Sequence, residues 1–250
     1  MNKSSVTRFY GFPLHVKEPF WLFESDSLIK AHPKYKEAKA GGVEAAVELV
    51  SDIVLDFLVS IKEKLPCNAI YIAPHAREAT GDNAIPQVLA TAAAIVANGT
   101  VETDIVQITR VYHTGADPME RMSLRPEFEG IVTQGGQYVL VDDVTSMGGT
   151  LAELTDYLLR SGGNIAAVIV LVNAGRVKQF QPTKKVIREL EKRYANEIEE
   201  IFGIVPCALT ANEANYLIGF KSADEIRNRL AKARKETDIR LRSKGIERQS

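Results

Sequence analysis

Residues 138–154, YVLVDDVTSMGGTLAEL, run from an apolar segment through two aspartates and a glycine-containing turn into a segment of helical spacing. Four apolar residues in succession, YVLV, are typical of a strand that is covered on both faces of a sheet. Gly148 and Gly149 suit a tight turn from that strand into a helix. The stretch therefore predicts a strand–turn–helix unit of an α/β fold.

Similar units precede and follow this stretch. Further strands are predicted over 68–73 (NAIYIA), 102–112 (ETDIVQITRVY), 164–173 (NIAAVIVLVN) and, as a short last strand, 203–210 (GIVPCALT). Helical segments separate the strands, and this alternation indicates a doubly wound, mainly parallel sheet with N- and C-terminal helical extensions. Ligand sites of such sheets lie outside the carboxyl ends of the strands, which is where the turn at 145–150 stands.

Helices are predicted from apolar residues spaced three and four apart and from cap residues. The first predicted helix begins at Pro33, is weakened at Gly41-Gly42 and resumes over 43–65. The others are 84–99 after Asp82 or Asn83, a segment ending at Arg160, 183–202, and two C-terminal helices joined near Gly219. The capping boxes Thr210–Glu213 and Ser222–Glu225 mark the starts of the last two. We expect an aromatic lead-in and helix over 1–65, a core over 66–209 and a helical extension over 210–250.

Composition narrows the class of protein. A chain of 250 residues with 45% apolar content can bury one large core, and its net charge of -1 provides no overall basic field for nucleic acid. No window approaches the ~20 apolar residues of a membrane span, and the N-terminus lacks a signal-peptide pattern. Cys67 and Cys207 form no disulfide or zinc pattern, so we expect a cytoplasmic protein. The N-terminal aromatic residues are compatible with a homodimer.

The turn itself has the chemistry of a phosphate site. N–H groups at the start of a helix lack intrahelical partners, and the helix dipole adds partial positive charge there. Glycine allows close approach of a ligand, and hydroxyl groups add donors. The candidate binding residues are Thr145, Ser146, Met147, Gly148, Gly149 and Thr150.

Asp142 and Asp143 limit the kinds of ligand that the turn could bind, because two carboxylates beside a phosphate would repel it unless they faced other groups. Sugar hydroxyls and Mg²⁺ are the natural partners of carboxylate oxygens. The sequence therefore predicts a sugar phosphate, bound with magnesium. The alternative is that the two aspartates only end a strand and cap a helix.

The segment 139–151, VLVDDVTSMGGTL, resembles the phosphoribosyl pyrophosphate signature of the type I phosphoribosyltransferases. The resemblance implies that Asp142 and Asp143 act in catalysis by binding the ribose hydroxyls, and that residues 145–150 surround the 5-phosphate. It also implies a transferase of nucleotide metabolism that uses magnesium phosphoribosyl pyrophosphate. The order of strands and helices from about 68 to 209 agrees, whereas the first 65 and last 40 residues are not covered.

The resemblance assigns roles to two loops. In the loop 73–83 it implies that Arg77 holds pyrophosphate, with Ala76 as a small residue and His75 as a donor, although the paired glycines of the family are missing. An ordinary surface loop is the alternative. A mobile lid is expected over 113–136, with Arg110 at its base and Arg121 and Arg125 within it.

The sequence defines less well the nucleobase, or similar nitrogen nucleophile, that would accept the ribose 5-phosphate. Ser146 stands where 6-oxopurine enzymes of this family carry a carboxylate base, and serine cannot serve as that base at its ordinary pKa. This argues against a hypoxanthine or guanine enzyme but not against orotate-type or adenine-type chemistry. Asn173, Arg176 and Lys178 are placed to read a base, or belong to a plain strand-to-helix loop.

Two other functions stay open. The same pocket could sense phosphoribosyl pyrophosphate or a nucleotide without turnover, with the terminal helices as the output. Alternatively, the C-terminal helices could bind DNA, although acidic residues dilute their positive charge. The candidate phosphate contacts in that case are Arg227, Arg229, Lys232, Arg234 and Lys235.

Overall fold

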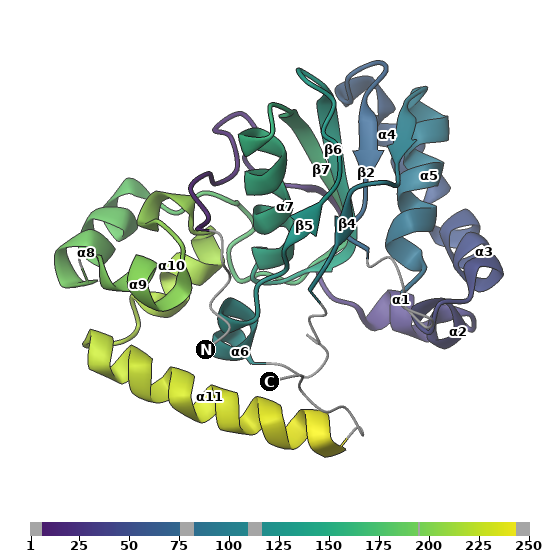
Figure 1. Cartoon of the computed structure of the whole chain (residues 1–250). Helices are drawn as coiled ribbons and strands as arrows, with labels where there is room; N and C mark the ends of the chain where they lie inside the picture. The colour runs from purple at the N-terminus through teal and green to yellow at the C-terminus, as the bar shows by residue number, and fades with distance from the viewer. Residues whose placement is uncertain (1–6, 76–82, 110–116, 195, 244–250) are drawn as a thin grey trace.

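The computed structural model describes residues 7–75, 83–109, 117–194 and 196–243, with side chains as far as residue 239. Within these residues the main sheet has five strands in the order β1-β7-β6-β2-β3, and every neighbouring pair is parallel (Figure 1). The strands are β1 (Phe20–Phe23), β2 (Ile70–Ile72), β3 (Thr100–Glu102), β6 (Gln137–Thr145) and β7 (Asn164–Asn173). The predicted α/β fold with a doubly wound, mainly parallel sheet is confirmed.

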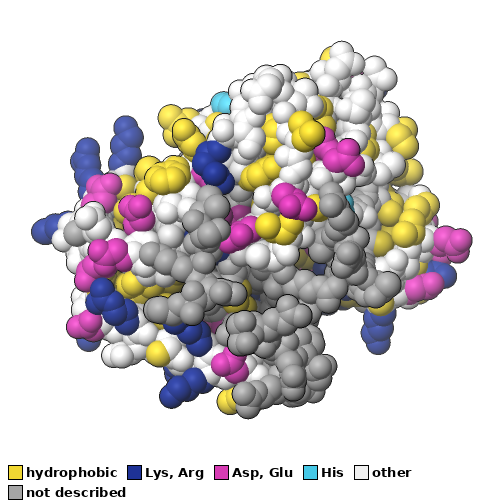
Figure 2. Space-filling view, viewed as in Figure 1, with side chains coloured by type: hydrophobic (Ala, Val, Ile, Leu, Met, Phe, Trp, Pro, Cys, Tyr) yellow, Lys and Arg dark blue, Asp and Glu magenta, His cyan; other side chains and the backbone are white. Residues whose placement is uncertain are grey.

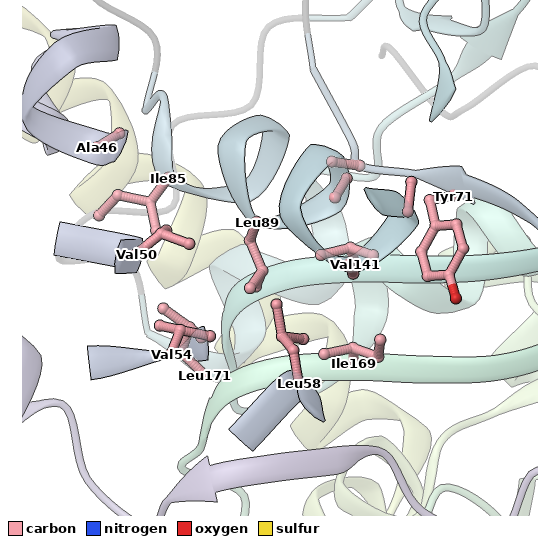
Figure 3. Packing of buried hydrophobic residues seen from close by; sticks show 14 of the residues in the cluster. Ala46, Val50, Val54, Leu58, Tyr71, Ile85, Leu89, Val141, Ile169 and Leu171 are labelled. Carbon is pink, nitrogen blue, oxygen red and sulfur yellow. The ribbon is translucent and has the colours of Figure 1, made fainter. Parts of the chain in front are cut away.

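Helices cover both faces of this sheet. On one face α3 (Val43–Ile53), α4 (Leu55–Ile61) and α5 (Ile85–Ala97) pack on alternate residues of the strands, such as Val139 and Val141 of β6. Figure 3 shows side chains of these helices gathered over Val141, Ile169 and Leu171. α7 (Gly149–Arg160) covers the other face, where Tyr138 and Leu140 point. The apolar run of β6 is thus buried on both sides, as its sequence predicts.

The N-terminal part differs from its prediction in two ways. Its aromatic segment supplies the edge strand β1, which pairs with β7. The expected continuous helix over 43–65 is interrupted at Val54, whose φ of -119° ends α3, and a 3-10 turn (Lys62–Lys64) follows α4. Two short helices, α1 (Ser27–Ala31) and α2 (Tyr35–Lys39), precede α3.

The predicted strand 102–112 is wrong in its bounds. β3 already ends at Glu102, because the N–H of Asp104 donates to the Glu102 carboxylate and turns the chain. β4 (Val106–Gln107) then pairs antiparallel with β5 (Phe128–Glu129), outside the main sheet. Together with α6 (Pro118–Ser123), β4 and β5 form a small hood, by which we mean residues 106–109 and 117–129.

The C-terminal end is helical, and here two predictions are corrected. The expected helix over 183–202 consists of two elements, α8 (Lys184–Tyr194) and α9 (Glu197–Phe202). The expected strand over 203–210 is absent from these described residues: Ile204 makes an isolated bridge to Arg8, and Pro206 begins a 3-10 turn (Pro206–Ala208).

The two helices that follow, α10 (Ala211–Leu217) and α11 (Ala223–Ser243), match the prediction. The capping box of Thr210 and Glu213 is confirmed. The second box is only half formed, since the Ser222 hydroxyl accepts from the N–H of Glu225 while the Glu225 carboxylate accepts from Lys221 instead. Among the described residues, no helix has the length and apolar character needed to cross a membrane.

Candidate functional site

The predicted phosphate turn lies at the carboxyl end of β6, between two neighbouring strands of the sheet. β6 continues through both aspartates to Thr145, and the turn proper is 146–148. Gly148 takes the left-handed conformation at φ 78° and precedes the first residue of α7. Gly148 is the N-cap residue of α7 and has no side chain that could accept from the first N–H groups of the helix. This arrangement leaves room for an anion to accept from them.

Asp143 is nearly buried, with 4% of its surface exposed, and it carries two partners. The Lys39 ammonium lies 2.5 Å from its Oδ2 atom, and the Asn83 amide donates to the same oxygen at 2.9 Å. Burial lowers the pKa of Lys39, but the Asp143 carboxylate outweighs this and raises it overall. The carboxylate is therefore held in one orientation by a cation and an amide.

Asp142 is in a different environment from its neighbour. Its Oδ1 atom accepts from the N–H of Asp143 at 2.8 Å. Although part of the side chain reaches the surface, protein crowds the carboxylate, and this desolvation together with the negative charge of Asp143 raises the pKa of Asp142. A ligand that offers hydroxyl donors or a cation would relieve this penalty.

One of the predicted arginines, Arg121 of the hood, contacts the turn. Arg121 of α6 donates through Nη1 to the Ser146 hydroxyl at 2.5 Å. Burial lowers the pKa of Arg121, but a guanidinium remains charged at neutral pH. The turn thus has a cation on one side and helix N–H groups below it, which is an environment for phosphate oxygens.

Other members of the predicted turn are fixed by neighbouring backbone. The Thr145 carbonyl accepts from Ala174, and the Met147 carbonyl accepts from the Thr210 hydroxyl at 2.6 Å. Gly149 and Thr150 form the first turn of α7 and are half-buried. Residues 145–150 therefore lie at the end of β6 and the start of α7, next to the two aspartates, and their role in binding phosphate stays a prediction.

The pyrophosphate loop is described only at its ends. His75 is half-buried, and its Nδ1 atom lies 3.1 Å from the Ala73 carbonyl. Ala76 and Arg77 lie outside the described residues, as does Arg110 at the base of the predicted lid.

The segment predicted as a mobile lid contains regular structure where it is described. Met119 and Met122 of α6 are buried in the cluster formed with the C-terminal helices. Arg125, expected on the lid, is 5% exposed and is bound to Glu153 of α7 through two contacts of 2.6 Å. Arg125 is thus a structural residue, because its guanidinium has no open side for a ligand.

Two of the three base-reading residues suggested after β7, Asn173 and Lys178, are also structural, while Arg176 is exposed. Asn173 is 2% exposed, and its amide donates to the Lys178 carbonyl and accepts from Gly175. Lys178 donates to the Asn173 carbonyl and lies 5.4 Å from the centre of the Trp21 ring. These contacts support the plain loop rather than base recognition.

Sequence reasoning missed Lys39 as a neighbour of the site. Its helix, α2, precedes Asp143 by about a hundred residues and carries no motif, so nothing in the sequence signals the contact. Asn83 and Thr210 were recognised only as helix caps: Thr210 does cap α10, whereas the N-cap of α5 is Ala84, and Asn83 one residue earlier accepts from the N–H of Ile85. The fold adds a second contact to each.

Replacing Gly148 by alanine tests the turn. A side chain at φ 78° is expected to destabilise the protein by about 1–2 kcal/mol, and its Cβ atom would lie 3.4 Å from the Thr210 methyl group. Gly135→Ala is the matched control, because Gly135 is also left-handed, at φ 69°, and has nothing within 4 Å of the added atom. The melting temperature should fall in both variants, while the affinity for ribose 5-phosphate, measured by calorimetry, should fall only in Gly148→Ala.

The chain is similar in sequence to two longer proteins. No protein-family model matches the chain. Protein TraN of Escherichia coli is 36% identical over 215 residues, which cover 84% of this chain and 48% of TraN. An uncharacterized protein of Haemophilus influenzae is 39% identical over 132 residues, covering 52% of this chain and 30% of that protein. The chain spans about half or less of the length of these curated relatives.

Similar solved structures include two adenine phosphoribosyltransferases. That of Leishmania donovani is 14% identical, with a TM-score of 0.36, and the match covers 78% of this chain and 87% of that one. That of Leishmania tarentolae is also 14% identical, with a TM-score of 0.33 and coverage of 63% and 92%. A hypothetical protein from Neisseria gonorrhoeae with bound ppGpp has 12% identity, a TM-score of 0.29 and coverage of 65% and 78%. At these scores, the function has to be argued from this chain's own residues.

Proposed function

We propose that this protein is a phosphoribosyltransferase that transfers ribose 5-phosphate from magnesium phosphoribosyl pyrophosphate to a nitrogen nucleophile. The observation that carries the proposal is the position of two adjacent carboxylates, Asp142 and Asp143, near the end of the strand that leads through a short turn into α7, whose N-cap is a glycine. The carboxylates suit ribose hydroxyls, and the helix N-terminus suits the 5-phosphate.

In the proposed reaction, the bond between the anomeric carbon and the pyrophosphate oxygen breaks, and its electron pair leaves with pyrophosphate. A bond from the acceptor nitrogen to the same carbon forms, and the nitrogen releases its proton to solvent water. Positive charge develops on the ribose between these events, and the Asp142 carboxylate would stabilise it, whereas the charge of Asp143 is already paired with Lys39. Arg121 at Ser146 neutralises phosphate charge on the other side of the turn.

The carboxylates fit a magnesium ion by their chemistry, because hard oxygen atoms are the ligands that Mg²⁺ prefers. In the described residues, however, no group of three or more His, Cys, Asp or Glu could hold a metal ion. Lys39 already neutralises Asp143. In this proposal Asp142 is the residue that would contact magnesium carried in with the diphosphate, and the ion would supply positive charge for the departing pyrophosphate.

The test is pyrophosphate release from magnesium phosphoribosyl pyrophosphate across a panel of nucleobases. Release that depends on one base, and that is lost in a variant with both Asp142 and Asp143 changed to asparagine, is the expected result. Binding of the sugar diphosphate with no release for any base would contradict the transferase and support a sensor.

One observation favours the sensor as a second candidate. α11 is attached to the helix that carries Arg121: Arg229 forms an ion pair with Asp117, and the Thr237 hydroxyl donates to buried Glu120. A ligand that moves Arg121 would therefore act directly on the C-terminal helix. The sensing function needs the same pocket but no chemical step.

The DNA-binding alternative is less well supported. Arg227 is paired with Asp224 and Glu197, and Lys232 with Glu236. Figure 2 shows acidic and basic side chains intermixed over the end of the molecule formed by α8 to α11. Such a mixed surface lacks the continuous positive charge that duplex DNA attracts.

A further inference from the structure

A buried ionic cluster lies behind the candidate phosphate turn, and its centre is Arg8. The Arg8 side chain has 0% exposure; Nη1 lies 3.1 Å from Glu153, and Nη2 forms a closer ion pair with Glu213. Burial by itself lowers the pKa of Arg8, but the Glu213 and Glu153 carboxylates more than reverse this and raise it. Arg8 therefore stays charged in the interior.

The cluster is balanced in charge. Glu153 has a second partner, Arg125, which also donates to the carbonyls of Phe202 and Gly203 at 2.9 and 2.8 Å. Two guanidinium groups thus face two carboxylates. The four side chains come from the lead-in, the hood, α7 and α10, so the cluster joins the parts of the chain that the resemblance leaves uncovered to the helix of the turn.

Glu213 extends from this cluster to the turn. Its Oε1 atom lies 3.1 Å from the position that a Cβ atom on Gly149 would occupy, and its Oε2 atom accepts from the N–H of Thr210. Thr210 in turn holds the Met147 carbonyl. A bare carboxylate at this place would repel a phosphate bound by the first N–H groups of α7, since like charges a few ångströms apart interact strongly inside a protein.

We infer that Glu213 and Arg8 are positioning residues that set the affinity of the turn for phosphate. Glu213 lies beside Gly149 and, through Thr210, supports the turn at Met147, and Arg8 cancels the charge that Glu213 introduces there. The inference rests on the proposed function in one respect, namely that the turn binds the 5-phosphate.

Glu213→Gln separates charge from support. Glutamine keeps the shape of the side chain and still accepts from Thr210, but it removes one negative charge beside the turn. We expect calorimetric affinity for ribose 5-phosphate to rise roughly three- to tenfold, because the charge of Arg8 is then only partly neutralised. A purely structural role would leave the affinity unchanged or lower it, so the direction of change decides. Glu200→Gln, at an exposed glutamate of α9, is the matched control and should leave the affinity unchanged.

Arg8→Met is expected to weaken binding of ribose 5-phosphate at least tenfold, because Glu213 then acts on the phosphate without a counter-charge. Combining Arg8→Met with Glu213→Gln should restore most of the lost affinity. Where Arg8→Met does not fold, Glu213→Gln alone decides the matter.

Unchanged or weaker binding in folded Glu213→Gln overturns this inference while the proposed function stands, provided that wild-type protein binds and Asp142→Asn does not. Failure of the wild-type protein to bind ribose 5-phosphate overturns the proposed function, and this inference with it.

Discussion

Replacing both Asp142 and Asp143 by asparagine is expected to weaken binding of magnesium phosphoribosyl pyrophosphate by roughly a hundredfold or more, since hydrogen bonds to charged groups are each worth about 1.5–3 kcal/mol. Asparagine keeps the size of each side chain but offers one acceptor oxygen and no charge to the ribose hydroxyls. Isothermal calorimetry measures the change directly. Asp56→Asn, at an exposed aspartate of α4, should bind like the wild-type protein.

The part of the loss that comes from Asp142 should not reflect unfolding, and the pH dependence of the stability of Asp142→Asn tests this. The pKa of Asp142 is raised in the folded state, so wild-type protein loses stability as pH rises from the unfolded value of about 3.9 through the folded pKa. Asp142→Asn lacks this loss. Its melting temperature should equal or exceed that of wild type at pH 8, and the difference should shrink toward pH 4. A less stable Asp142→Asn at pH 8 would contradict the assignment of the raised pKa.

Binding has its own pH dependence. Hydroxyl donors and cations favour the ionised carboxylate, so affinity for the sugar diphosphate should rise with pH until the folded pKa of Asp142 is passed. Asp142→Asn should bind weakly and without this rise. A wild-type affinity that falls over the same range would argue that the protonated acid is the binding form.

Replacing Arg125 by methionine is expected to destabilise the protein by about 3–5 kcal/mol, because it leaves the Glu153 carboxylate in the interior with less positive charge around it. The Phe202 and Gly203 carbonyls lose a donor as well. Denaturant unfolding measures the free energy. Lys30→Met, at the exposed pair with Asp26, is the control and should leave unfolding almost unchanged.

The double variant Arg125→Met with Glu153→Met tests the cause. It leaves Arg8 and Glu213 as a balanced buried pair. We therefore expect it to be more stable than Arg125→Met alone, although it contains one more substitution. If the double variant is the less stable of the two, packing around Arg125 rather than charge balance accounts for the loss.

Local features of the sequence determined the central unit of the fold. The run YVLV fixed β6 because four successive apolar residues need cover on both faces, and Gly148 fixed the turn because its φ of 78° suits glycine. The capping box of Thr210 and Glu213 likewise marked the start of α10. Each depends on residues a few positions apart, so the sequence alone contains the physical information.

The errors lie where distant contacts override local pattern. The pattern over 43–65 is that of one helix, yet the chain bends at Val54 where α3 and α4 pack on the sheet together. The residues 203–210 have a strand-like composition, but among the described residues Ile204 makes only an isolated β-bridge, to Arg8 of the lead-in. Arg125 lies in the segment 113–136 that was predicted to be a lid, but its side chain is buried because it pairs with Glu153 of α7.

The segment 138–154 by itself predicted a site for phosphate and sugar hydroxyls, since the strand, the aspartates, the glycines and the helix follow one another in the sequence. Only the tertiary structure decided what surrounds that place: Lys39 on Asp143, Arg121 on Ser146, and Glu213 with Arg8 behind the turn. The physical reason is that charges acting on one another across a few ångströms here come from residues up to about two hundred positions apart. Which charges neutralise one another is therefore a property of the folded chain.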